Sequence, residues 1–482
     1  MMKTKIILCL LVVTSLLGSC KKFLDEPSDN RTLITTVPDM EKTLNYLLPY
    51  SDYHFTDFMT DDYIFRDLSG HIVSTAAEQL LPIFEFSITR ESLPGTQFVS
   101  AGFNPVTAFR RYYYRIINSW LIIEKAAQLN PVNDAEKRRI EILVAKAKAT
   151  KAYCNYMLVS LFAKQYDAAT AGSDKGIPFI DKYYGEAVVG YKVVSVKEIF
   201  DNVEADFLSA LAKLDDSEPG NTPFTFSKDA VLGLLTRLYL DKKDWDNSIK
   251  YADMLIKRRG TPLNVKSIRN SITDYAAYSD KYFDPANSSY LLMGNNTFQL
   301  IAYFWSGMYP YPALQLMEDN DADPDANYVI QTSALFRDYV PQKFGKFFNL
   351  ATRNFNMPLV TVDEVYFNRA EAYIMKNNGL TSEAKADLTL MIKNQTFTDG
   401  AANARIASME GMTGLDPALD LLLMTKRIRF SSEGLRWFDM KRHRIPVSHT
   451  GRSGTYKIDG TNPEAYVIKL PQEEISRNPD LQ

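Results

Sequence analysis

Apolar residues recur along much of the chain at alternating steps of three and four, the spacing that lines one face of an α-helix. Within residues 136–162 this stripe is formed by Ile142, Ala145, Ala149, Ala152, Tyr156 and Val159. Its three alanines allow a neighbouring helix to approach closely. The pattern therefore predicts a long helix that is buried along one side.

Two later segments each predict a pair of antiparallel helices joined by a short polar turn. The first covers residues 229–256 and turns at residues 241–246, and the second covers residues 365–392 and turns at residues 377–379. Helix pairs with small residues at their crossing are typical of tetratricopeptide-like repeats. Because the copies are irregularly spaced, we expect an all-α fold of such helix pairs rather than a regular solenoid.

Two stretches interrupt the helical pattern. Residues 50–90 carry aromatic side chains among acids and turn residues, and residues 261–345 are rich in Tyr, Asn, Asp, Pro and Gly. We expect long ordered loops in both stretches. Loops of this size on a rigid helical scaffold usually serve binding.

The N-terminus has the features of an exported lipoprotein. Two lysines precede an apolar run over residues 6–17, which is too short to span a bilayer, so we expect a signal peptide over residues 1–19. The residues that follow, Leu-Gly-Ser-Cys ending at Cys20, resemble a bacterial lipobox, whose cysteine is acylated. We expect a lipidated tether over residues 20–35 and one domain over residues 36–482. A secreted protein without lipid on Cys20 is the alternative.

Composition argues against several classes of protein. The 482 residues include 55 Lys and Arg against 58 Asp and Glu, interspersed along the chain, which argues against a nucleic-acid partner. Four His and three Cys leave few ligands for a metal, and we expect no cofactor. Cys154 lies in an apolar helical stretch, where we expect a buried small hydrophobic side chain rather than a catalytic thiol.

Motifs for catalysis are missing or incomplete. The chain has no HExxH, GxSxG, GxGxxG or GxxxxGK[ST] segment. Residues 319–323 offer oxygens at calcium-loop positions, but Pro324 and Ile330 stand where such a loop needs glycine and glutamate, so we favour a solvated turn. Acids in residues 57–67 leave a glycoside hydrolase as one alternative. Glu433 and Asp439 are a further candidate pair of catalytic acids.

A series of short motifs carries a resemblance to a known family. They are KFLD at residues 22–25, a tyrosine-containing helix at residues 113–118, GIPF at residues 176–179, VKEIF at residues 196–200 with the helix at residues 206–211, DEVY and AEA within residues 363–372, EGLRWFDMKR at residues 433–442, and LPQEEI with NP within residues 470–479. Together with the lipobox, and in this order, they resemble the SusD/RagB family of Bacteroidetes surface lipoproteins. The resemblance does not extend to residues 261–345.

The resemblance implies a SusD-like helical fold and a binding protein rather than an enzyme. It also implies a lipid-anchored, surface-exposed place at the outer membrane and a partner, a TonB-dependent transporter of the SusC type. The chain departs from the family at Arg429, where an acidic residue is usual, and at Leu435, where histidine is frequent; these changes put a local ion pair in doubt. Arg436, Asp439 and Arg442 lie three residues apart on one helical face and can satisfy one another.

We therefore expect a nutrient-binding protein that captures an oligosaccharide and delivers it to a SusC-like transporter. A peptide ligand, a glycoside hydrolase and a purely structural repeat adaptor are the alternatives. Sugars stack on flat aromatic rings; their hydroxyl groups donate hydrogen bonds to Asp and accept them from Asn and Arg. The expected ligand-binding residues, taken from the two loop stretches, are Asp61, Asp62, Tyr63, Arg66, Trp305 and Tyr309.

Overall fold

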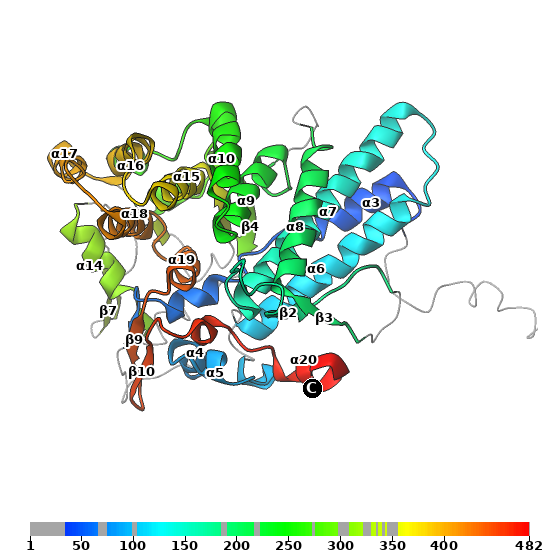
Figure 1. Cartoon of the computed structure of the whole chain (residues 1–482), viewed down its shortest axis with the longest axis horizontal. Coiled ribbons are helices and arrows are strands. Elements are labelled where there is room, and N and C mark those ends of the chain that lie inside the picture. Colours follow the sequence, from blue (N-terminus) through cyan, green and yellow to red (C-terminus); the bar gives the residue numbers. More distant parts are fainter. Residues whose placement is uncertain are drawn as a thin grey trace, which may run out of the picture.

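The structure, a computed structural model, describes residues 34–65, 75–98, 104–184, 190–215, 222–271, 275–296, 308–321, 329–333, 336–339, 343–344 and 355–481. The expected signal peptide, Cys20, Arg66 and Trp305 lie outside these residues. Long helices dominate the described part, with short antiparallel strand pairs between them (Figure 1). The all-α prediction is confirmed.

The first group of long helices consists of α6 (Pro105–Ala126), α7 (Asp134–Phe162) and α8 (Val196–Leu211), with α7 packed against both others. Each helix begins at a side-chain cap: Asn104, Asn133 and Ser195 accept hydrogen bonds from backbone N–H groups of the first turn. All six residues of the stripe predicted within residues 136–162 are buried. The prediction of this helix is confirmed.

The next two helices, α9 (Lys228–Asp241) and α10 (Trp245–Arg259), form the first predicted helix pair. Ser227 and Asp244 cap their N-termini, and Gly260 ends α10 in the left-handed conformation. The second predicted pair is α15 (Val362–Asn377) and α16 (Ser382–Gln395). Both helical hairpins are confirmed.

The pairs follow one another in space as in sequence. Helix α8 contacts α9, and α10 contacts α15, so the helices form a continuous row from α6 to α16 (Figure 1). Further helices complete the described part: α3 (Val37–Asn45), α4 (Thr75–Phe84), α5 (Ser87–Arg90), α11 (Val265–Asn270), α12 (Tyr275–Tyr282), α14 (Tyr311–Asp319), α17 (Asp399–Ala407), α18 (Leu415–Arg429), α19 (Arg436–His443) and α20 (Gln472–Arg477). Short 3₁₀ helices are η1 (His54–Met59), η2 (Gly95–Phe98), η4 (Pro463–Tyr466) and η5 (Pro479–Leu481).

The strands form two-stranded antiparallel pairs. These are β1 (Ile64–Phe65) with β5 (Met308–Tyr309), β2 (Lys175–Pro178) with β3 (Val193–Ser195), β4 (Tyr290–Asn296) with β8 (Phe355–Thr361), β6 (Val329–Ser333) with β7 (Phe336–Tyr339), and β9 (Val447–Thr450) with β10 (Thr455–Ile458). The pairs cap and connect the helices rather than forming a separate layer (Figure 1).

The prediction of long loops over residues 50–90 and 261–345 is wrong for much of both stretches. The first contains η1, α4 and α5, and the second contains α11, α12, α14 and strands β4 to β7. Strand β4 pairs with β8, more than sixty residues further along the chain, and such distant partners leave no local period in the sequence.

A large apolar core runs through the helical row and continues under the C-terminal segment. Trp437 of α19 and Tyr466 are fully buried in it, with their ring centroids 5.6 Å apart. Cys154 is buried in the same core, as predicted, and burial raises the pKa of its thiol to about 12. Among the described residues, no helix is both long and apolar enough to cross a membrane.

Candidate functional site

The two stretches chosen from the sequence as the binding region meet in space. Strand β1 pairs with β5, so that Ile64 lies opposite Tyr309 and Phe65 lies opposite Met308. This ladder joins segments separated by more than two hundred residues and places the backbone of Tyr309 beside the segment that contains Asp61, Asp62 and Tyr63. We call this region, residues 61–65 with 308–311, the β1–β5 edge.

Asp61 lies in a cluster of arginines. Its two carboxylate oxygens accept hydrogen bonds from Arg436 Nε and Nη2 at 2.9 and 2.8 Å, and Arg427 Nη1 lies 3.2 Å from Oδ2. Burial alone would raise the pKa of Asp61, but the hydrogen bonds and charges of the two arginines hold it below its ordinary value. The side chain nevertheless keeps a 27% exposed fraction.

Asp62 and Tyr63 are more deeply buried than Asp61. Asp62 is buried and pairs with Arg427 Nε, and burial raises the pKa of its carboxyl group, which the charge of Arg427 only partly offsets. The hydroxyl of Tyr63 lies 3.0 Å from Ser432 Oγ, and its ring packs edge-on against Phe58. Tyr63 is 3% exposed, so its ring faces protein rather than solvent.

The remaining expected residues are only partly placed. The backbone of Tyr309 belongs to β5, whereas Arg66 and Trp305 lie outside the described residues. The role of all six residues in ligand binding stays a prediction. Those with described side chains, Asp61, Asp62 and Tyr63, already have partners within the protein.

Two side chains at the β1–β5 edge face solvent. Ile64 is 43% exposed, and Tyr311, the first residue of α14, is 48% exposed. The hydroxyl of Tyr311 donates to Gln315 Oε1 at 3.3 Å. Tyr311 lies in the tyrosine-rich stretch of residues 261–345, whose composition does not indicate which ring is exposed.

The EGLRWFDMKR segment supports this edge from inside. Gly434 adopts a φ of +80° and donates its N–H to both carboxylate oxygens of Asp57 at 3.1 Å. A Cβ atom at this position would lie 2.7 Å from the ring of Tyr53. The segment therefore requires glycine, because both the backbone conformation and the space exclude a side chain.

Glu433 and Asp439, the alternative catalytic acids, are both buried in ion pairs. Glu433 accepts hydrogen bonds from Lys343 at 2.7 Å and Tyr282 at 2.6 Å. Asp439 accepts from Lys426 at 2.7 Å and from Arg442 at 2.5 Å. Burial alone would raise the pKa of each carboxyl group, but the neighbouring cations lower both. These acids hold helices together.

Arg429, the residue that departs from the SusD/RagB pattern, forms a buried ion pair. Its Nε donates to Asp363 Oδ1 at 2.6 Å, and its Nη1 lies 3.5 Å from Glu433 Oε1. Asp363 and Arg429 are both almost completely buried. At this position the chain therefore forms an ion pair of its own, with Arg429 as the cation.

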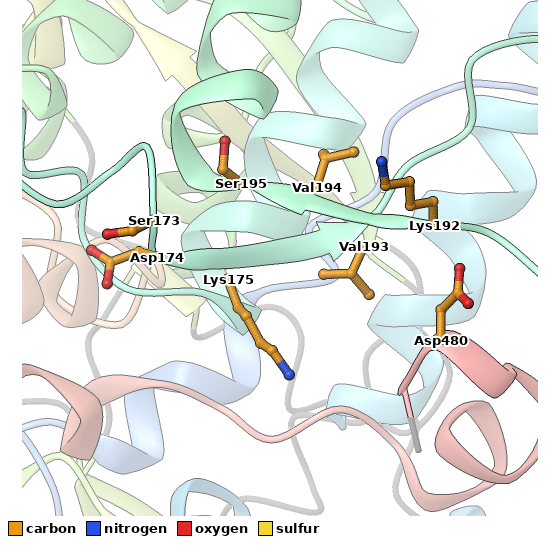
Figure 2. A pocket seen from close by; sticks show the side chains of 8 residues that line it. All are labelled: Ser173, Asp174, Lys175, Lys192, Val193, Val194, Ser195 and Asp480. Carbon is orange, nitrogen blue, oxygen red and sulfur yellow. The ribbon is translucent and has the colours of Figure 1, made fainter.

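Two surface pockets are defined by described side chains. The first, of about 580 Å³, follows the hairpin of β2 and β3 (Figure 2). It is lined by Ser173, Asp174, Lys175, Lys192, Val193, Val194, Ser195 and Asp480. The NP motif lies beside this hairpin, because Asn478 donates a hydrogen bond to the Tyr191 carbonyl, just before β3, at 2.8 Å. Its lining includes no aromatic ring on which a sugar could stack.

The second pocket, of about 590 Å³, lies between the start of α9, the end of α10 and the turn before β4. It is lined by Thr222, Pro223, Ser227, Asp229, Arg258, Arg259, Pro285, Ala286, Asn287, Ser288, Tyr290 and Leu291. Tyr290 is buried, so this pocket too presents polar groups rather than an exposed ring.

No group of three His, Cys, Asp or Glu side chains suited to a metal occurs within the residues that the structure describes. At the calcium-like segment, Asp321 Oδ2 accepts a hydrogen bond from the Thr398 backbone at 3.1 Å. Asp323 lies outside the described residues. Asp321 thus serves as a hydrogen-bond acceptor between segments.

Comparison with known proteins agrees with this architecture. Residues 22–240 match the family model SusD-like, described as starch-binding and associating with the outer membrane. None of the curated proteins matches the chain at a significant level.

Solved structures match over nearly the whole chain. A SusD superfamily protein from Bacteroides thetaiotaomicron is 20% identical, with a TM-score of 0.70 over 93% of this chain and 99% of that one. A SusD superfamily protein from Bacteroides fragilis is 18% identical, with a TM-score of 0.69 over 93% and 99%. A SusD-like carbohydrate-binding protein from Bacteroides vulgatus is 15% identical, with a TM-score of 0.64 over 92% and 97%.

The matched segment contains helices α6 to α8, nearly all of α9 and the GIPF motif, and the agreement in fold with the solved structures covers 93% of the chain. Residues 22–240 thus match the SusD-like family model, and the chain shares the fold of SusD superfamily proteins.

Proposed function

We propose that the protein captures an oligosaccharide at the cell surface and delivers it to a SusC-like TonB-dependent transporter. The observation that carries this proposal is the family match, whose description names starch binding and the outer membrane. The similarity in fold to a carbohydrate-binding protein from Bacteroides vulgatus supports it.

The β1–β5 edge is the proposed ligand surface. Tyr311 presents an exposed ring. Ile64, which is also exposed, adds apolar surface and lies opposite Tyr309, two residues before Tyr311. The flat C–H face of a sugar ring can stack on such a tyrosine. Trp305 and Tyr309 are the further proposed stacking residues, and Arg66 is a proposed polar anchor.

Of Asp61, Asp62 and Tyr63, which the sequence suggested as ligand-binding residues, only Asp61 is exposed enough to contact a ligand directly. Asp61 retains partial exposure and can contact a ligand while it pairs with Arg436. Asp62 and Tyr63 are buried, so a ligand reaches them only if the edge rearranges. We therefore propose that Asp61 and Tyr311 contact the ligand directly and that the buried Asp62 and Tyr63 support the structure of the edge.

The lipid anchor and the transporter belong to the same proposal. A lipid on Cys20 would hold the protein at the outer membrane, and a protein with only a lipid anchor needs a transporter to move its cargo inward. Replacing Cys20 by Ala should release the protein from membranes with its fold unchanged. Purification of the lipidated protein from gently solubilised outer membranes should recover a SusC-like barrel.

A peptide ligand is the second candidate, because the exposed tyrosine and the partly exposed Asp61 would also suit a peptide. A glycan array and a peptide library, screened side by side with the purified protein, decide between the two. Tyr311→Ala should weaken binding of the best ligand about tenfold, as the loss of a stacked ring does.

Tyr114→Ala is the matched control for this experiment. Tyr114 is a tyrosine of α6 with a 56% exposed fraction, and it lies away from the β1–β5 edge. Its replacement should leave affinity unchanged. Equal affinity of Tyr311→Ala and wild type would remove the β1–β5 edge from the proposal, and no binding in either screen would contradict ligand capture itself.

A further inference from the structure

His449 of β9 places both nitrogen atoms of its imidazole ring against backbone carbonyl groups. Nδ1 lies 2.7 Å from the carbonyl oxygen of Phe84, and Nε2 lies 2.8 Å from the carbonyl oxygen of Thr60. A carbonyl oxygen accepts hydrogen bonds and cannot donate them, so each of these contacts requires an N–H group on the ring. The neutral ring has one N–H group and the imidazolium has two. Only the protonated form of His449 can therefore make both hydrogen bonds.

Two aromatic rings hold the imidazole in this position. The ring of Phe84 stacks on it with a centroid separation of 4.1 Å and an interplanar angle of 8°, and the ring of Phe86 stacks at 4.7 Å and 19°. His449 is 3% exposed, and Thr60 and Phe84 are fully buried. Because the ring has little room to turn, the neutral form leaves one buried carbonyl group facing a nitrogen that has no proton. Such an unmade hydrogen bond inside a protein is costly.

The two carbonyl groups belong to segments that support the β1–β5 edge. Thr60 directly precedes Asp61, the first residue of this edge. Phe84 ends α4, and its ring centroid lies 6.1 Å from that of Phe65 in β1. Strands β1 and β9 are also in contact. His449 thus joins β9, the end of α4 and the residues that lead into β1 at a single ring.

Burial and hydrogen bonding act on the proton of His449 in opposite directions. Burial lowers its pKa, because the charged ring loses its hydration, whereas the two carbonyl groups and the negative charge of Asp61 raise it. The effect of burial is the larger one, so the pKa of His449 lies below its ordinary value. The ring is therefore neutral at neutral pH and takes up its second proton in acidic solution.

Several other ionisable groups lie on the segments around His449. They are Asp57, Asp62, Glu85 and Tyr456, together with Arg427 and Arg436, which pair with Asp61. Burial raises the pKa of both Asp57 and Asp62, so these two carboxyl groups also take up protons as the pH falls. A variant that lacks the imidazole separates the protonation of His449 from theirs.

A histidine that only fills space in the core does not require this geometry. At His443 the partner is a carboxylate: Nε2 lies 2.8 Å from Oε1 of Glu371, so a negative charge in contact with the ring balances its protonated form. At His449 both contacts are to neutral carbonyl groups. The second proton on this ring therefore depends on the two hydrogen bonds and on the field of Asp61.

We propose that His449 is a positioning residue for the β1–β5 edge, and that its protonation fastens the start of this edge to α4 and β9. The imidazolium holds the carbonyl groups of Thr60 and Phe84 together, whereas the neutral ring releases one of them. The backbone of residues 61–65 is therefore held more tightly in acidic than in neutral solution. The effect on ligand affinity rests on the proposed capture of a glycan at this edge, because a preorganised surface loses less entropy on binding.

The protonation of the ring is measured by NMR on protein labelled with ¹⁵N-histidine, from about pH 8 to about pH 4.5. The signal of His449 is the one that disappears in His449→Gln, and His449→Phe, which keeps an aromatic ring in the stack, provides a second assignment. We expect the nitrogen shifts of a neutral ring at the upper end of the range and those of an imidazolium at the lower end. A ring that keeps one protonation state throughout would overturn the proposal.

Hydrogen exchange of backbone amides measures the edge itself. Rates at residues 61–65, corrected for the intrinsic effect of pH, should be about fivefold slower when His449 is protonated. His449→Gln retains one N–H donor group but takes up no proton, so it should show the faster rates at both pH values. His443→Gln, the matched control in α19, should keep the pH effect of the wild type. A pH effect that survives in His449→Gln, or none in the wild type, would overturn the proposal.

Binding of maltoheptaose, a fragment of starch, is measured by calorimetry at the same two pH values, because the matching family model is described as starch-binding. The wild type should bind more tightly in the acidic buffer, and His449→Gln should bind equally in both. Equal affinity of the wild type at both pH values would overturn the role of His449 in binding. Absence of maltoheptaose binding bears on the proposed function alone, because the titration and the exchange rates decide on His449 without a ligand.

Discussion

Arg436 donates two hydrogen bonds to Asp61, one from Nε to Oδ1 at 2.9 Å and one from Nη2 to Oδ2 at 2.8 Å. This bidentate pair joins α19, within the EGLRWFDMKR segment, to the β1–β5 edge, more than three hundred residues away in sequence. Arg427 of α18 adds a second cation to the same carboxylate. The partly exposed acid at the proposed ligand surface is thus also an anchor of the fold.

The first prediction separates these two roles of Asp61. Asp61→Asn removes the charge that pairs with both arginines, and it should lower the free energy of unfolding by about 1–3 kcal/mol, because the pair is mostly buried. Urea unfolding followed by circular dichroism measures this loss. Asp201→Asn, which disrupts the exposed pair with Lys197, should change stability by less than about 0.5 kcal/mol.

Ligand affinity adds the second readout. If Asp61 contacts the ligand, Asp61→Asn weakens binding even at a temperature where the variant is fully folded. A variant with wild-type affinity and reduced stability would assign Asp61 to the fold alone.

The sequence predicted the helical part of this protein well because its signals are local. The stripe in α7 and the polar turns of the α9–α10 and α15–α16 pairs are each visible within one helix or one hairpin. The order of short motifs was also sufficient to indicate a resemblance to the SusD/RagB family, because each motif can be recognised without knowledge of the residues that it contacts.

The candidate site depended on distant partners and was harder to predict. Tyr63 looks like an available ring in sequence, but it packs against Phe58 and reaches Ser432, which lies 369 residues away. Tyr311, by contrast, is 48% exposed at the start of α14. No period in the chain distinguishes a buried aromatic residue of a loop stretch from an exposed one.

The second prediction concerns the buried pair of Arg429 and Asp363. Arg429→Met should lower the free energy of unfolding by about 3–5 kcal/mol, because it leaves the carboxylates of Asp363 and Glu433 buried with one cation fewer. Thermal and urea unfolding measure the loss. Lys197→Met, at an exposed pair, should remain close to wild type, and a similarly small effect of Arg429→Met would contradict the importance of the pair.

The third prediction concerns Gly434. Gly434→Ala adds a Cβ atom at a φ of +80°, within 3 Å of the rings of Tyr53 and His54, and should cost about 2–4 kcal/mol of stability. Gly411→Ala is the matched control, because Gly411 has a φ of +74° and open space around the added Cβ. The control measures the backbone strain alone. Equal losses in the two variants would rule out the proposed clash with Tyr53.

The fourth prediction concerns the pH dependence of stability through Glu371. This carboxylate is buried and accepts hydrogen bonds from Arg442 Nε at 2.8 Å and Arg442 Nη2 at 2.9 Å, and His443 Nε2 lies 2.8 Å from its Oε1. Burial alone would raise the pKa of Glu371, but the charges of Arg442 and His443 hold it well below its ordinary value.

Because the pKa of Glu371 is lower in the folded protein than in the unfolded chain, its contribution to stability decreases as the pH falls. The ionised form of Glu371 stabilises the folded protein fully above the unfolded-state pKa of about 4.3, and this contribution is lost as the pH falls through the lower folded-state value. Glu371→Gln should therefore cost about 3–5 kcal/mol at pH 7 and progressively less below about pH 4. Urea unfolding of both proteins from pH 7 to pH 3 measures the difference. Glu41→Gln, at a partly exposed pair with Arg139, should change stability little at any pH. A constant cost of Glu371→Gln across this range would contradict a lowered pKa.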